Sequence, residues 1–230
     1  TGWATLLAED EDGEEPNNLI YVQDSNVYGI EADISLPVGS TMGAAIYLQI
    51  LDLSPFAGVE AELMYDGSGV KFWFENESSE EEITKDAALG TTYKLAVVHE
   101  NNKNTIYLDD VKVAEFSATN FSVDSIGIGA FHDEGGAYTV YADNIRVMST
   151  STVTSDSSDS SDSTDTSDSS DSTLDWQDYD DFSDNSLDTS KWEAGYFSGG
   201  QTAVEANGMI ELKGGNDGLN TVAPFADPLY

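Results

Sequence analysis

Apolar and polar residues alternate along most of the first 147 residues of this chain, and Tyr28 to Leu36 (YGIEADISL) shows the pattern clearly. Successive side chains of a strand point to opposite faces of a sheet, so this period of two predicts half-buried strands. Met42 to Leu53 is nearly continuous in apolar residues, which suits a strand buried on both faces. Further strands are predicted over 19–22, 59–65, 70–75, 93–99, 105–108, 111–113, 125–131 and 138–147.

Turn signals separate these segments. Pro37-Val38-Gly39-Ser40 is one, and Asp66-Gly67-Ser68-Gly69 predicts a hairpin between two of the strands. Glu77 to Ala88 is the one stretch with some helical character, and it is short. Many short strands without a convincing helix predict an all-β fold, an antiparallel β-sandwich.

Residues 149–174 differ from the rest of the chain. Aspartates recur among Ser and Thr at every third position from Asp156 to Asp171, and no apolar side chain stands between Val153 and Leu174. Such a stretch buries too little surface to offset its ordering entropy, which predicts an extended, self-repelling linker.

Charge narrows the functional classes. The chain carries 44 acidic and 8 basic residues, a formal net charge of −36. This excess repels nucleic acid and anionic membranes, so we expect neither as a partner. It favours divalent cations, above all Ca²⁺ with its preference for oxygen ligands, although solubility alone also explains an acidic surface. Cysteine is absent, and no apolar run approaches the ~20 residues of a membrane span.

Two segments carry a family resemblance. "TIYLDDVKVAEF" and "IGIGAFHDEGGAYTVYADNIRV" (105–116 and 126–147) resemble the closing strands of concanavalin-A-like, or laminin-G-like, jelly rolls. "DDFSDNSLDTSKWEAG" and "VEANGMIELKGG", between Asp180 and Gly215, resemble the opening of the same family. In that family the opening strand lies beside the closing strand. The resemblance implies a jelly roll written in rotated order.

The rotated order predicts three segments: 1–148 with the middle and closing strands, the linker 149–174, and 175–230 with the opening strands. Three arrangements satisfy it: a tandem array of covalently joined units, a polymer of separate chains that lend strands, and a permuted chain whose own tail folds back. An unfinished sandwich exposes sheet edges, and lending strands removes that liability. We therefore expect 175–230 to complete a neighbouring unit, with Tyr230 leading in space to the next Thr1.

Catalytic motifs are weak. Laminarinase-type relatives of the resembled family carry Glu-x-Asp-x-x-Glu on one strand. Here Glu31-Ala32-Asp33 ends in Leu36 instead of the last Glu, and Glu60-Ala61-Glu62 also lacks a third carboxylate. We interpret both pairs as solvent-facing positions of strands and expect no catalytic residues. The two histidines, His99 and His132, are far apart in sequence and have no thiolate to complete a zinc site.

Calcium is the better candidate. Asp10 and Asp12 have the spacing of a cation-binding loop, without the Glu that completes an EF-hand. Jelly rolls of the resembled family often hold a structural ion where opening and closing strands meet, which would implicate Asp143 and Asp181. Sugar binding in lectin-like jelly rolls uses aromatic side chains beside polar groups. The candidates are Trp3, Trp73, Trp176 and Trp192, but Trp73 lies between Phe72 and Phe74, and core packing explains at least half of the four.

The sequence thus favours a structural protein: a repeating, self-associating β-sandwich unit of an extracellular filament or surface fibre, assembled head to tail by shared strands. A carbohydrate-binding adhesin repeat is the alternative, with glycans as partners, and a glycoside hydrolase is the third hypothesis.

Overall fold

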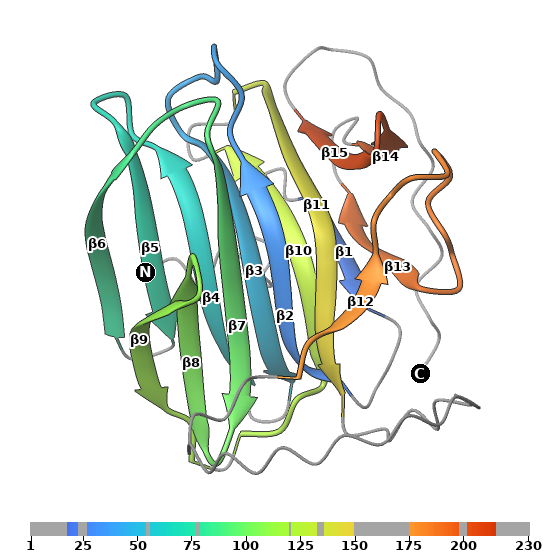
Figure 1. The fold of residues 1–230 in the computed structure, drawn as a ribbon. Coiled ribbons are helices and arrows are strands. Elements are labelled where there is room, and N and C mark those ends of the chain that lie inside the picture. The colour runs from blue at the N-terminus through green and yellow to red at the C-terminus, as the bar shows by residue number, and fades with distance from the viewer. Residues whose placement is uncertain are drawn as a thin grey trace, which may run out of the picture.

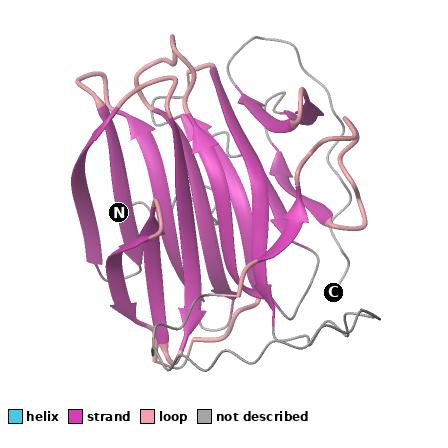
Figure 2. Cartoon of the chain, in the orientation of Figure 1, coloured by secondary structure: helices cyan, strands magenta, loops and turns pink. Residues whose placement is uncertain are grey.

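The computed structural model describes residues 18–22, 27–53, 56–76, 79–119, 121–132, 136–149, 175–197 and 202–214. Two antiparallel sheets face each other with the core between them (Figure 1). The described part of the chain forms strands and loops without a helix (Figure 2). The predicted all-β sandwich is confirmed.

The first sheet has seven strands in the order β13-β1-β10-β3-β4-β5-β6. Their bounds are Trp192–Phe197 for β13, Asn18–Val22 for β1, Ser125–His132 for β10, Ala44–Leu53 for β3, Phe56–Tyr65 for β4, Val70–Asn76 for β5 and Ser79–Ala87 for β6.

The second sheet has the order β14-β15-β11-β2-β7-β8-β9, and the short β12 also pairs with β11. Their bounds are Thr202–Ala206 for β14, Met209–Gly214 for β15, Tyr138–Ser149 for β11, Val27–Ser35 for β2, Thr92–Glu100 for β7, Lys103–Leu108 for β8, Val111–Ser117 for β9 and Gln177–Asp180 for β12.

Strand positions follow the alternation of the sequence closely. The predicted strand 28–36 is β2, Val27–Ser35. The predicted hairpin turn forms as well, because Asp66 Oδ1 accepts the backbone N–H groups of Ser68 (2.8 Å) and Gly69 (2.9 Å). The stretch 77–88, considered as a possible helix, contains β6 instead, which pairs with β5 through residues 79–87. The sheet edge beside β5 outweighs the local helical character.

The tail of the chain completes the sandwich of the same molecule. β12 pairs with β11 through Asp180 and Ile145, β15 pairs with the other half of β11, and β13 pairs with β1. These strands lie together at one end of the sandwich (Figure 1). The opening strand therefore lies beside the closing strand, as the resemblance to concanavalin-A-like jelly rolls implies. The two-sheet antiparallel sandwich that the resemblance implies is confirmed.

Of the three arrangements, the structure contains the one in which a chain's own tail folds back. This differs from the expectation that 175–230 completes a neighbouring unit. A fully extended linker of this length spans about 80 Å, which is long enough for the tail to reach β11 of its own chain. Exchange of the same strands between copies stays a prediction.

Two aromatic side chains anchor the tail in the core. Phe182, after β12, is 0% exposed and Trp192, at the start of β13, is 2% exposed. Their rings stack with centroids 5.9 Å apart, and the ring of Tyr179 meets Trp192 edge-on at 5.2 Å. The tail thus contributes core side chains as well as backbone pairing.

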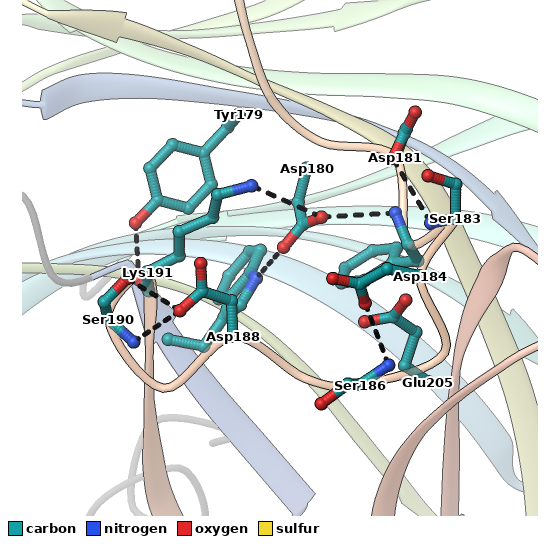
Figure 3. Close-up of polar contacts among 12 residues, drawn as sticks. Tyr179, Asp180, Asp181, Ser183, Asp184, Ser186, Asp188, Ser190, Lys191 and Glu205 are labelled. Carbon is teal, nitrogen blue, oxygen red and sulfur yellow. Dashed lines mark hydrogen bonds and ion pairs between the residues drawn. The ribbon is translucent and has the colours of Figure 1, made fainter.

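Aspartates shape the loop between these anchors (Figure 3). Asp180 accepts hydrogen bonds from the indole Nε1 of Trp192 (2.8 Å) and from the backbone N–H of Phe182 (3.2 Å). Asp184 and Asp188 each accept the N–H two residues ahead, at 2.9 and 2.8 Å. These Asx turns satisfy backbone donors that have no strand partner, so the acidic residues of this loop serve its conformation.

We predict that Trp192→Ala lowers the free energy of unfolding by about 3–5 kcal/mol, because it removes a buried ring and its hydrogen bond to Asp180. Trp192→Phe should cost less, since it keeps most of the ring. Urea denaturation measures both, and Asp178→Asn, at an exposed position of β12, serves as the control. Equal stability of Trp192→Ala and the wild type would contradict the anchoring role.

Candidate functional site

The seven-stranded sheet carries polar side chains on the face that points away from the core. Ile46, Leu48, Phe72 and Phe74 belong to the core between the sheets. The residues that alternate with them point to the other side. We call six of these the outer patch: Tyr47, Gln49, Glu60, Glu62, Trp73 and Glu75.

Strand register arranges the outer patch in two rows across β3, β4 and β5. Tyr47 lies opposite Glu62, which lies opposite Trp73. Gln49 lies opposite Glu60, which in turn lies opposite Glu75. Side chains directly opposite each other on one face have Cβ atoms about 4.5–5.5 Å apart, so each row is contiguous.

Several polar atoms of the outer patch are buried without a hydrogen bond. Gln49 is 0% and Glu60 2% exposed. Both amide atoms of Gln49, Oε2 of Glu60 and the indole Nε1 of Trp73 have no hydrogen-bond partner among the described residues. A buried polar group without a partner costs about 1–3 kcal/mol, so folded proteins rarely keep several in one place without a use for them.

Three carboxylates act on each other in the outer patch. Burial raises the pKa of Glu60 well above its usual value, and the carboxylates of Glu62 and Glu75 add to the rise. Glu60 therefore holds its proton in a range where an exposed Glu has lost it. A protonated carboxyl both donates and accepts hydrogen bonds, as the amide of Gln49 does.

An aromatic cluster borders the patch at β10. The ring of Tyr47 lies across Gly129, where a Cβ would come within 2.0 Å of the ring. The ring of Phe131 is 5.9 Å from that of Tyr47, centroid to centroid. The absence of a Cβ at Gly129 thus gives the Tyr47 ring its place against the neighbouring strand.

The outer patch corrects one interpretation of the sequence. Glu60 is not solvent-facing, and neither is Glu31, which is 3% exposed. Glu31 forms an ion pair with Arg146 across the β2–β11 ladder, which explains its burial. Glu60 has no such ion pair with a described residue. Gln49 belongs to no catalytic or binding motif of the sequence, although a glutamine inside an otherwise apolar strand is a signal that a sequence can give.

The tryptophan candidates separate clearly. Trp192 belongs to the core, whereas Trp73 is half-buried in the outer patch with Phe72 and Phe74 on the opposite face. Trp176 is half-buried beside β12, and Trp3 lies outside the described residues.

Two of the four predicted calcium ligands come together. Asp143 lies on β11 and Asp181 directly follows β12, which pairs with β11. Burial raises the pKa of Asp143, and the nearby carboxylates of Asp33 and Asp181 contribute to the rise. Asn144 Nδ2 also donates to Asp33 (2.9 Å). Within the described ranges no group of three metal-binding side chains has the geometry to hold an ion. Calcium binding stays a prediction, and Asp10 and Asp12 lie outside the described residues.

A hollow lies where the loop before β3 meets the start of β11; it is lined by residues 37–41 and 137–139. The Thr41 hydroxyl donates to the Ala137 carbonyl (2.8 Å) and lies 3.0 Å from Nε2 of His132. The Gly136 N–H donates to Nδ1 of the same ring (2.9 Å). These groups bind each other, which makes this hollow a poorer candidate than the outer patch. His99 lies on β7 of the other sheet, so the two histidines do not form a site together.

Comparisons with known proteins identify no family by sequence: no family model matches the chain, and no curated protein does. Among the described residues no helix has the length and apolar character to cross a membrane.

Solved structures similar to the chain include carbohydrate-binding module CBM66 from Bacillus subtilis, with 21% identity, a TM-score of 0.38 and coverage of 54% of this chain and 84% of that one. Another is a Bacillus licheniformis β-glucanase, with 12% identity, a TM-score of 0.37 and coverage of 50% and 56%. The Caenorhabditis elegans galectin LEC-6 has 18% identity, a TM-score of 0.35 and coverage of 52% and 92%. At these values the similarities carry no argument about function.

We predict that Glu60 makes the protein less stable as pH rises. Its pKa is higher in the folded than in the unfolded chain, so between the two values the folded state binds more protons and the free energy of unfolding falls with pH. Glu60→Gln should remove this contribution, which is at most about 1.4 kcal/mol per pH unit. Urea denaturation from pH 4 to 8 measures it.

Glu115→Gln is the control, because hydrogen bonds from Lys103 and Lys112 lower the pKa of Glu115 to about 2. Its stabilising contribution is present above the unfolded pKa and is lost only as pH falls. Removing it should leave the slope above pH 5 unchanged. Identical slopes in the wild type and Glu60→Gln would contradict the account of Glu60.

Proposed function

We propose that the protein is a carbohydrate-binding β-sandwich and that the outer patch is its sugar site. One observation carries this proposal: buried amide and carboxyl groups, Gln49 and Glu60, have hydrogen-bonding atoms without a protein partner and lie beside the rings of Tyr47 and Trp73.

The chemistry suits a sugar. A pyranose offers apolar C–H faces to an aromatic ring and hydroxyls that both donate and accept hydrogen bonds. Ligand sites generally combine apolar surface with a few well-placed polar groups. Here Trp73 and Tyr47 supply the aromatic surface, and Gln49 with protonated Glu60 supplies donors and acceptors.

A sugar would meet the half-buried side chains of the outer patch before it reaches the buried ones. Glu62, Trp73 and Glu75 are half-buried, whereas Tyr47, Gln49 and Glu60 are buried beside them. The first three therefore form the rim of the proposed site and the last three its floor. A ligand that reaches the floor satisfies atoms which otherwise remain without hydrogen bonds.

Glycoside hydrolysis is a second candidate, favoured by one feature. Glu60 is held protonated beside Glu62 and Glu75, and glycosidases pair a protonated acid with an ionised carboxylate. Release of reducing ends from a bound oligosaccharide, lost in Glu60→Gln, would support it. The expectation that the chain is not an enzyme stays a prediction.

The extracellular filament also stays a prediction. Its physical basis is that the tail strands pair with β1 and β11 in registers that a second copy offers equally. Mass photometry across a concentration series tests strand exchange: oligomers that vanish after truncation at residue 174 would support it, and monomers at every concentration would contradict it.

We predict that Trp73→Ala and Gln49→Ala each weaken glycan binding about tenfold or more, the effect of losing roughly 1.4 kcal/mol. A glycan array identifies a ligand, and isothermal titration calorimetry measures its affinity. Trp176→Ala is the matched control, a half-buried tryptophan outside the patch. The absence of any saturable glycan, or an equal loss in all three variants, would contradict the proposed site.

A further inference from the structure

The outer patch brings three carboxyl groups together on neighbouring strands. Glu60 faces Gln49 of β3 and Glu75 of β5, with Glu62 two residues further along β4. Lys71 of β5 is a described cation that contacts a residue of the patch. Its Nζ lies 2.9 Å from Asp66 and 5.9 Å from the centre of the Trp73 ring. Glu60 itself forms no ion pair with a described residue.

We propose that the outer patch selects a glycan with a protonated amine, a hexosamine unit whose amino group is free, over neutral and acidic sugars. This inference rests on the proposed function and names the ligand class of the same site. The geometry that points to it is the joint presence of three adjoining carboxylates, the unpartnered Oε1 of buried Gln49 and an aromatic ring at the rim.

The carboxyl, amide and aromatic groups of the outer patch can each interact favourably with the ammonium group of an amino sugar. Its three N–H donors match acceptors at Glu60 Oε2 and Gln49 Oε1, both of which lack a hydrogen bond in the protein. Lys71 Nζ lies over the Trp73 ring, 5.9 Å from its centroid, so this ring already takes part in a cation–π contact of the kind that an ammonium would make. A carboxylated or sulfated sugar would instead meet three carboxyl groups, which discriminates against it.

Proton release provides an independent signature. Burial, together with the carboxylates of Glu62 and Glu75, raises the pKa of Glu60 in the free protein and favours its protonated form. A bound ammonium favours the ionised carboxylate, so Glu60 should release its proton when the amine binds. A neutral sugar has no such effect.

Three β-1,4-linked disaccharides make a matched test, because their backbones are alike: chitobiose with free amines, di-N-acetylchitobiose and cellobiose. Each is titrated into the intact chain by calorimetry at pH 6 in 0.3 M salt, which screens the general charge of the acidic surface. We expect 1:1 binding, with the free-amine sugar at least about tenfold tighter than the other two. The titration is then repeated in buffers of different ionisation enthalpy. The observed binding enthalpy should depend on the buffer for the free-amine sugar, which shows that protons are released, and should not depend on it for the other two.

Glu60→Gln tests the assignment with a side chain of the same shape. It should abolish the preference for the amine and the proton release, because a glutamine amide still forms hydrogen bonds but does not ionise. Glu75→Gln, half-buried in the same row, should reduce the preference if Glu60→Gln does not fold. Asp178→Asn, an exposed aspartate on β12, should change nothing.

The outcomes separate this inference from the proposed function. Equal affinity for the three sugars overturns the amine preference and leaves sugar binding standing. An amine preference that persists in both Glu60→Gln and Glu75→Gln also overturns it, because the acidic surface then attracts the cation without the patch. Binding of none of the sugars counts against both.

Discussion

The pairing of β11 with β12 and β15 is the interaction on which the rest of the structure depends. β11 closes the 1–149 part of the chain, and on one side its edge would stay open without the tail. The tail fills that edge and delivers Phe182 and Trp192 to the core. Sheet edges and apolar faces are liabilities when exposed, so this closure is what makes the rotated order of segments compatible with one compact sandwich.

In the completed sandwich, one face of the seven-stranded sheet lies outside the core between the sheets. One set of side chains on β3, β4 and β5 packs the core, and the alternate set forms the outer patch. Gln49 and Glu60 in the outer patch lower the free energy of unfolding, because polar atoms of both side chains are buried without a hydrogen bond to a described residue. Such a cost is typical of binding sites, where a ligand supplies the missing hydrogen bonds.

Sequence predicted the fold well and the site poorly, for separate physical reasons. The period of two located β2, and the nearly continuous apolar run over 42–53 located β3, whose residues 44–50 are buried as that run predicts. The motif around Asp180 and Phe182 located the opening strand beside β11. Neither signal contains cross-strand register, which is what sets Gln49 opposite Glu60. Alternation shows which residues point away from the core but not whether that face is exposed, so it predicts a solvent-facing Glu60 where the structure has a buried one. The order of the strands is enough to predict that Asp143 and Asp181 lie near each other, because β11 pairs with β12. It does not predict the positions of the side-chain oxygens that a metal ion would require.

The central claim is that the outer patch is where this protein binds its ligand. Nitrogen-15 NMR of the intact chain, titrated with the oligosaccharide that binds most tightly, tests it directly. The account predicts the largest shifts at the Gln49 side-chain amide and the Trp73 indole N–H, the buried donors that lack a protein partner. Shifts centred instead on Thr41 and Thr139, in the hollow between the two sheets' loops, would contradict it.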